Sequence, residues 1–229
     1  MKTRDKILET ARELFNNDGV STVSSRNISD AMNISYGNLC YHFPKKDDII
    51  MQLYASMQTE LDTEVAKLRA EIFSFDFFIR SLRGMLEVLY KYKFVFLDLN
   101  LLARKSEHIR RHARKQYQFR LAICREIYDF LIREGYLKVE DWEGHYDMLA
   151  HSVLVILNSW IMDAEIYYKG DEGQKIDYYL QMIYRIVSAS LTKKGEDAFI
   201  RVYLHSEWRR RDQKRQENKA DQEETPASA

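Results

Sequence analysis

Residues 24–43 read SSRNISDAMNISYGNLCYHF, and this stretch decides the fold of the N-terminal part of the chain. A helix over 25–32 follows from a pair of serines suited to capping it, and a helix over 35–42 begins at a third serine, Ser35. Serine favours these positions because its hydroxyl accepts a hydrogen bond from a free N–H of the first helical turn. Asn33 tolerates the left-handed backbone that a tight turn needs. The stretch therefore predicts two short helices joined by a very short turn.

A further helix precedes this pair. Apolar residues recur at helical spacing over 3–17, with Thr3 as a candidate N-cap and Gly19 as a stop signal. Pro44 ends the last of the three helices. Three helices within 43 residues, two of them joined by a tight turn, are typical of a helix-turn-helix.

The helix over 35–42 has two different sides. Leu39 and Phe43 are expected to face the core, which leaves a polar side made of Ser35, Tyr36, Asn38, Tyr41 and His42. A ring-bearing polar face suits a flat, negatively charged partner such as a nucleic acid. For Tyr41 two interpretations stay open: it contacts a phosphate, or it packs half-buried between helices.

Composition supports an all-α protein. Hydrophobic residues make up 45% of the 229 residues and charged residues 31%, which is typical of a globular chain. Proline occurs only at Pro44 and Pro226, and long breaker-free stretches favour helices. Basic and acidic residues balance at 35 each, so nucleic-acid binding would depend on a local basic patch. Two cysteines provide no disulfide framework and indicate a reducing compartment.

The remaining chain continues as helices. A long helix is expected from Lys45 to about Ala70, and further helical patterns follow at 75–92, 94–104, 107–134, 142–168, 174–192 and 196–215. The alternating stretch 90–96 is interpreted as a joint between helices, because no partner strand is present. The expected division is a helix-turn-helix domain over 1–46, a larger helical domain over 47–215, and a disordered tail over 216–229.

Localisation is expected to be cytoplasmic. The N-terminus has a charged helical pattern without the apolar run of a signal peptide. The most apolar stretch, 149–162, is short and interrupted by polar residues, so no membrane span is expected.

The stretch 7–50 resembles the DNA-binding domain of the TetR family of bacterial transcriptional repressors. The matching positions span about a fifth of the chain and are Ala11, Leu14, Phe15, Gly19, Ile28, Ala31, Ile34, Ser35, Gly37, Leu39, Tyr41, His42, Phe43, Pro44 and Lys46. Asn33 and Cys40 depart from the family pattern, which more often has glycine and an aromatic residue there. The resemblance implies an N-terminal helix-turn-helix over 24–43 and an all-helical domain for ligand binding and dimerisation.

A helix-turn-helix places the N-terminal residues of its second helix at base edges in the major groove. Tyr36 and Asn38 are expected there, with Gly37 permitting close approach, since asparagine pairs with adenine and tyrosine contacts a thymine methyl or a phosphate. The whole expected DNA-binding set is Ser25, Arg26, Ser35, Tyr36, Gly37, Asn38, Tyr41, His42 and Lys46. The net charge over 24–46 is +2, with Asp30 as the one acidic residue.

Two helices are expected to form a homodimer. The helices near 142–168 and 174–192 are apolar over broad faces, and pairing with their copies would build a four-helix interface, as the resemblance also implies. A dimer sets two reading helices about 34 Å apart on a palindromic operator. The alternative is that both helices are monomer core.

A small-molecule effector is expected in the aromatic-rich middle of the chain, because apolar pockets with a few polar groups bind small molecules. The candidate contacts are Phe96, Asn100, Arg104, Tyr117, Arg120, His151, Asn158 and Trp160. Its identity is left open.

The predicted function is a DNA-binding repressor that a ligand releases from double-stranded DNA. The alternatives are a helical adaptor or an enzyme that keeps the motif without operator binding. No catalytic constellation, cofactor motif or metal-ligand spacing stands out, and His42 has no companion at ligand distance in sequence. We therefore expect neither enzymatic activity nor a cofactor.

Overall fold

The computed structural model describes residues 2–70 and 75–205, apart from the side chains of 68–70, 75–79 and 202–205. The described residues form helices joined by turns, with one isolated bridge between Leu137 and Leu191. In chain order the helices are α1 (Thr3–Asp18), α2 (Ser25–Ala31), α3 (Tyr36–His42), α4 (Lys46–Ala70), α5 (Phe75–Lys91), α6 (Lys93–Leu97), α7 (Leu99–Lys105), α8 (Glu107–Arg133), α9 (His145–Tyr167), α10 (Glu172–Ser188) and α11 (Lys193–His205). The all-α class is confirmed, and the expected tail over 216–229 lies outside the described residues.

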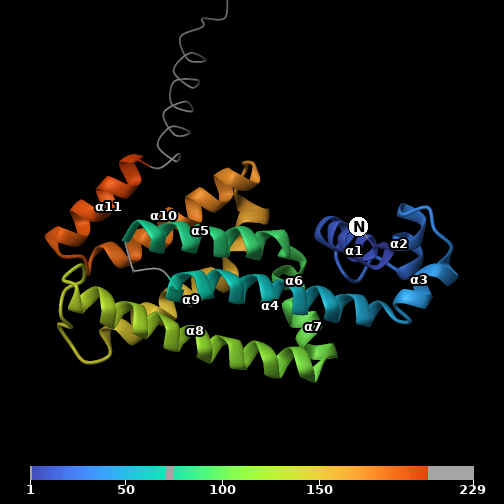
Figure 1. Ribbon diagram of the computed structural model, residues 1–229, viewed down its shortest axis with the longest axis horizontal. Helices are drawn as coiled ribbons and strands as arrows, with labels where there is room; N and C mark the ends of the chain where they lie inside the picture. The colour runs from blue at the N-terminus through green and yellow to red at the C-terminus, as the bar shows by residue number, and fades with distance from the viewer. Residues whose placement is uncertain (1, 71–74, 206–229) are drawn as a thin grey trace, which may run out of the picture.

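Helices α1–α3 form a small unit, called here the head, at one end of α4 (Figure 1). Ser24 caps α2 through a reciprocal box with Asn27, and Ser35 Oγ accepts the Asn38 N–H at 3.2 Å at the start of α3. Asn33 has a φ of 53°, so the turn between α2 and α3 uses the left-handed backbone predicted from its sequence. The α1 helix begins at Thr3 itself, after Lys2, and ends before Gly19, whose φ is 80°.

Helix α4 runs from the head into the larger group of helices α5–α11, called here the body (Figure 1). Asp48 accepts the Lys45 N–H at 3.0 Å at the first turn of α4. Residues of α4 belong to the head core near its start, and others line the body further along, as Ile49 and Leu61 show. One helix therefore reaches both parts.

The single helix expected over 94–104 is divided at Asp98 into α6 and α7. The Asp98 carboxylate accepts the Val20 backbone N–H at 2.9 Å, so this residue bonds to the loop after α1. The stretch around Tyr92 is a joint between helices α5 and α6, as its sequence predicted.

The body core is built around α9. Nine α9 residues are buried, including Leu154, Trp160 and Ile161, and they pack with α8 and α10. Among the described residues α9 alone is long and apolar enough to cross a membrane by composition, a property that the core helix of a soluble protein shares.

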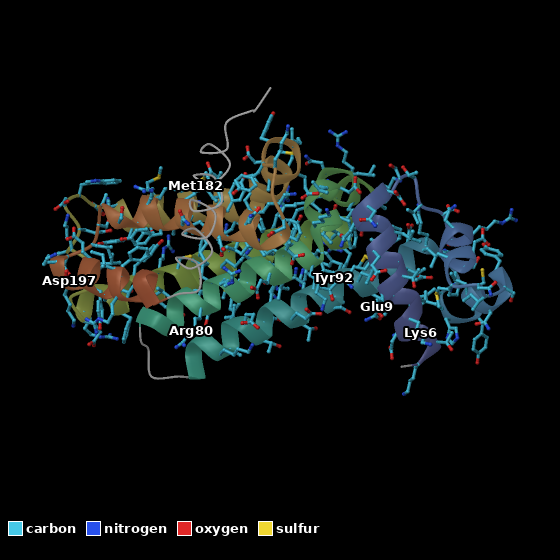
Figure 2. The ribbon with its side chains drawn as sticks, turned by 90° about the horizontal axis from the view of Figure 1, so that it is seen from above. Lys6, Glu9, Arg80, Tyr92, Met182 and Asp197 are labelled. Atoms are coloured by element: carbon cyan, nitrogen blue, oxygen red, sulfur yellow. The ribbon has the colours of Figure 1, made fainter. Side chains whose placement is uncertain are left out.

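Head and body share a core at their junction. Phe94 of α6 is fully buried against the head, and its ring centroid lies 5.4 Å from that of Phe15 on α1. Tyr92 lies at the same junction, while Asp197 on α11 marks the opposite end of the body (Figure 2). The head is therefore packed against α6 as well as connected through α4.

Candidate nucleic-acid interface and effector cavity

Helix α3 presents a polar face to the outside. Leu39 is fully buried and Phe43 is 3% exposed on its inner side, whereas Tyr36, Gly37 and Asn38 are exposed. Seven residues give two turns, and Ser35 fixes the first of them. The inner and outer sides are therefore set by the short amphipathic pattern of the sequence.

Tyr41 lies on this outer face with 85% of its surface exposed. The half-buried packing considered for it from sequence is therefore wrong. An exposed tyrosine on a short helix has a free hydroxyl for a phosphate oxygen. His42 beside it is partly buried, with its ring 5.2 Å from that of Tyr41.

Arg26 of α2 lies next to Tyr36 of α3. Its guanidinium carbon is 5.6 Å from the Tyr36 ring centroid, a cation–π distance that joins the two helices at the outer face. A hydrogen bond with the Cys40 side chain raises the pKa of Tyr36 above its ordinary value. Ser25 is partly buried at the start of α2.

Lys46 has an internal role that the sequence did not indicate. Its Nζ donates to the carbonyl oxygens of Val20 and Val23, each at 2.8 Å. An ammonium group has three N–H donors, so one remains for a phosphate. The residue fixes the loop between α1 and α2.

A cavity of about 170 Å³ lies in the body between α4, α8 and the helices around them. Of the candidate ligand contacts, Phe96, Arg120 and Asn158 lie in its wall. Asn100 and Arg104 are exposed outside the wall, and three others lie outside it within the body, namely Tyr117, His151 and Trp160. Tyr117 Oη and His151 Nδ1 are hydrogen-bonded to each other at 3.0 Å, and Trp160 is a core side chain stacked on Tyr90.

Arg120 is the positively charged residue in the wall of the cavity. Burial lowers its pKa, against the opposing effects of Tyr54, Cys124 and Tyr117. Its Nε bonds only to the Gln116 carbonyl of its own helix, at 3.4 Å, and no ion pair with it is formed within the described ranges. The same burial raises the pKa of the Cys124 thiol to about 11.

Helix α6 touches both the cavity and the head. Val95 and Phe96 line the cavity, while the neighbouring Phe94 packs into the head core. Asn16 of α1 bonds to both ends of the joint between α5 and α6. Its amide donates to the Lys91 carbonyl and accepts the Phe94 N–H, each at 3.0 Å. Sequence reasoning missed these contacts and Asp98, although Asp98 was visible as the one acidic residue in an apolar run.

Comparison with known structures supports this arrangement. A TetR-family transcriptional regulator from Marinobacter aquaeolei VT8 superposes with a TM-score of 0.77 and 24% identity, over 89% of this chain and 98% of that one. A transcriptional regulator from Saccharomonospora viridis, solved with choline, has a TM-score of 0.63 and 20% identity over 82% of this chain and 96% of that one. A ketosteroid transcriptional regulator of Mycobacterium tuberculosis has a TM-score of 0.60 and 17% identity over 84% and 96%. At these identities the likeness shows the fold.

Matches to sequence-family profiles identify the family of this chain more directly than the structural comparisons do. No curated protein sequence matches it significantly. Residues 7–53 match the profile of bacterial regulatory proteins of the tetR family, and residues 56–199 match that of a bacterial transcriptional repressor, TetR. These two matches cover the head and most of the body. With an exposed polar face on α3 in the first and a cavity in the second, the chain belongs to the TetR family of DNA-binding transcriptional regulators.

Proposed function

We propose that this regulator is a cytoplasmic homodimeric repressor, which leaves a palindromic operator when a small molecule enters the body cavity. The observation that carries the proposal is the outer face of α3, where Tyr36 and Asn38 are exposed while Leu39 holds the helix to the head. A helix held in this way can insert its first residues into a major groove.

In this proposal Tyr36 and Asn38 contact base edges, and Ser35 and Gly37 lie close to the duplex. Arg26, Ser25, Tyr41 and His42 contact the backbone, and the third N–H of Lys46 points to a phosphate. Asparagine bonded to an adenine edge contributes about 1–3 kcal/mol of discrimination against a wrong base. Phosphate contacts add affinity that falls steeply with salt.

The test is a gel-shift titration of the full chain with fragments of its own promoter region at low salt. Asn38→Ala should weaken binding to the preferred fragment by about 5- to 150-fold and leave binding to unrelated DNA nearly unchanged. Asn17→Ala, an exposed asparagine at the end of α1, is the matched control. Equal binding of all fragments by the wild type, or equal loss with both variants, would contradict the reading role of α3.

The dimer is proposed to form through α9 and α10. On one side of α9 three large apolar residues recur every seven positions and a fourth follows one helical turn later. They are 52–64% exposed in the single chain: Met148, Val155, Met162 and Ile166. Ser152 and Ser159 lie between them, with hydroxyls bonded back to the helix carbonyls. Burying this stripe against its copy would remove it from water.

Val155→Arg should convert the dimer to a monomer, because an arginine in the middle of the stripe would be buried without a partner. Sedimentation measures the mass, and the same variant should lose operator affinity because the two half-sites are no longer linked. Val139→Arg places the same side chain at a loop position that is 77% exposed and should stay dimeric. A dimeric Val155→Arg would place the interface elsewhere.

Release from the operator is proposed to depend on both helices that connect the body to the head, α4 and α6. A ligand that widens the cavity would press on α4 through Tyr54 and Met57 and on α6 through Val95 and Phe96. Since Phe94 and Asn16 join α6 to α1, movement of α6 would turn the head. The ligand needs only to bind the DNA-incompetent arrangement more tightly to shift the population.

A further inference from the structure

The body cavity is long relative to its volume. Its wall on α8 extends from Ala113 to Leu131, which at 1.5 Å per residue is about 27 Å. Its volume of about 170 Å³ is close to that of a cavity of about 150 Å³ known to hold one benzene molecule. We call this elongated cavity the channel, and its length along α8 suits an unbranched aliphatic ligand better than fused rings.

The two ends of this channel differ in polarity. Helices α4 and α8 run side by side from the head end of the body, and Tyr54 of α4 is hydrogen-bonded to His112 of α8 at 3.1 Å (Figure 1). Apart from Asn158, the charged and amide side chains of the wall come from the half of the channel nearer the head: Gln58, Asp62, Gln116 and Arg120. The other end is formed by apolar side chains, among them Leu131, Leu137, Leu191 and Phe199.

Arg120 at the polar end has no counter-ion in the described part of the chain. One of its five N–H donors is used, by the Gln116 carbonyl of its own helix. The other charged wall residue, Asp62, is exposed and makes no ion pair with it. A partly buried guanidinium without a counter-ion is costly, and its planar fork matches the two oxygens of a carboxylate.

We propose that this channel binds a straight-chain aliphatic carboxylate, with its two oxygens on the Arg120 guanidinium and its chain along α8 towards Phe199. The proposal rests on the proposed function only in treating the cavity as the effector site. The carboxylate lies in the half of the channel nearer the head, close to Tyr54 of α4, so its arrival changes the charge balance next to a helix that leads to α3. Asp62 limits the affinity through like-charge repulsion.

Isothermal titration of the full chain with octanoate, decanoate and dodecanoate tests how affinity depends on the length of the aliphatic ligand. Titration with 1-decanol and decylamine tests how affinity depends on its polar group. Affinity should rise about fourfold for each added methylene until the chain outgrows the channel. Decanoate should bind about 10- to 100-fold more tightly than decanol, because the charged hydrogen bonds to Arg120 are lost with the alcohol. Equal binding of decanoate and decanol, or binding that does not change with chain length, would overturn the proposal.

Arg120→Met removes the charge and keeps the length of the side chain. It should abolish the preference for decanoate over decanol, whereas Arg104→Met, at an exposed arginine outside the wall, should retain it. Asp62→Asn should strengthen decanoate binding several-fold and leave decanol unchanged, which keeps the test valid even if Arg120→Met fails to fold. Preference retained in Arg120→Met, or an Asp62→Asn variant that binds both compounds alike, would contradict the assignment.

A parallel gel shift separates this inference from the proposed function. If the protein binds its promoter fragment but no carboxylate, the ligand class is wrong and the repressor function stands. If decanoate binds with the expected head-group preference and the promoter fragment is never bound, the ligand class stands and the proposed function fails.

Discussion

The bond between Asp98 and Val20 gives a test of how the head is attached to the body. The Val20 N–H is donated to the Asp98 carboxylate at 2.9 Å, across the junction between the loop after α1 and the break between α6 and α7. Val20 is only 4% exposed, so water does not readily replace this acceptor. Asp98→Ala therefore leaves a buried donor unpaired.

The expected cost follows from the charge and the burial. Hydrogen bonds to charged groups contribute about 1.5–3 kcal/mol, and an unsatisfied buried donor costs a similar amount, so Asp98→Ala should lose about 2 kcal/mol of unfolding free energy. For a chain of this size that corresponds to a fall in Tm of roughly 4–8 °C. Asp98→Asn keeps an acceptor oxygen without the charge and should lose about 1 kcal/mol or less.

Urea unfolding followed by circular dichroism measures the free energies, and hydrogen exchange of the peptide containing Val20 locates the effect. Exchange at that peptide should be faster in Asp98→Ala, while α9 peptides change only as far as global stability changes. Asp18→Ala is the control, because Asp18 is an exposed acid at the end of α1. An Asp98→Ala variant within 0.5 kcal/mol of wild type, or equal losses for the alanine and asparagine variants, would refute the reasoning.

Three further predictions concern the body. Burial opposes ionisation of Glu165, but hydrogen bonds from Lys175, Lys93 and Tyr90 outweigh it and lower its pKa to about 2 from 4.5. The stability it supplies is therefore fully present above about pH 4.5 and lost as pH falls towards 2, and Glu165→Gln should be less stable at pH 7 with a shallower acid slope in Tm. Gly195→Ala should lower the unfolding free energy by about 1–3 kcal/mol in urea titration, because the new methyl group would overlap the Tyr136 carbonyl oxygen; an unchanged midpoint would contradict this packing. Cys124, with its thiol pKa raised to about 11 by burial, should react far more slowly with iodoacetamide at pH 8 than free cysteine does, as mass spectrometry of the labelled peptide would show.

Local signals in the sequence were enough to predict the helices of the head. The capping role of Ser35, the left-handed Asn33 and the stop at Gly19 each depend on interactions within a few residues, and the structure shows all three. The same holds for the inner and outer sides of α3, because the spacing of Leu39 and Phe43 along a helix fixes which side is buried.

Contacts between distant residues were not accessible in this way. Asp98 breaks a helix that its apolar neighbours would continue, because it bonds to Val20, 78 residues earlier. Lys46 is held by two carbonyl groups of the loop after α1. The residues near Asp98 and Lys46 in the sequence do not indicate either of these contacts.

The sequence by itself determined the helix-turn-helix, its exposed face and the all-helical class, since capping, turn chemistry and amphipathic spacing are local properties of the chain. Only the tertiary structure decided which aromatic and polar residues of the middle part surround a cavity. Arg120 and Asn158 enter the wall while Arg104 and Asn100 are exposed outside it, although each of the four stands next to an apolar residue in the sequence. The choice depends on how α4, α8 and α9 pack against one another, and packing is a property of pairs of helices that no single segment encodes.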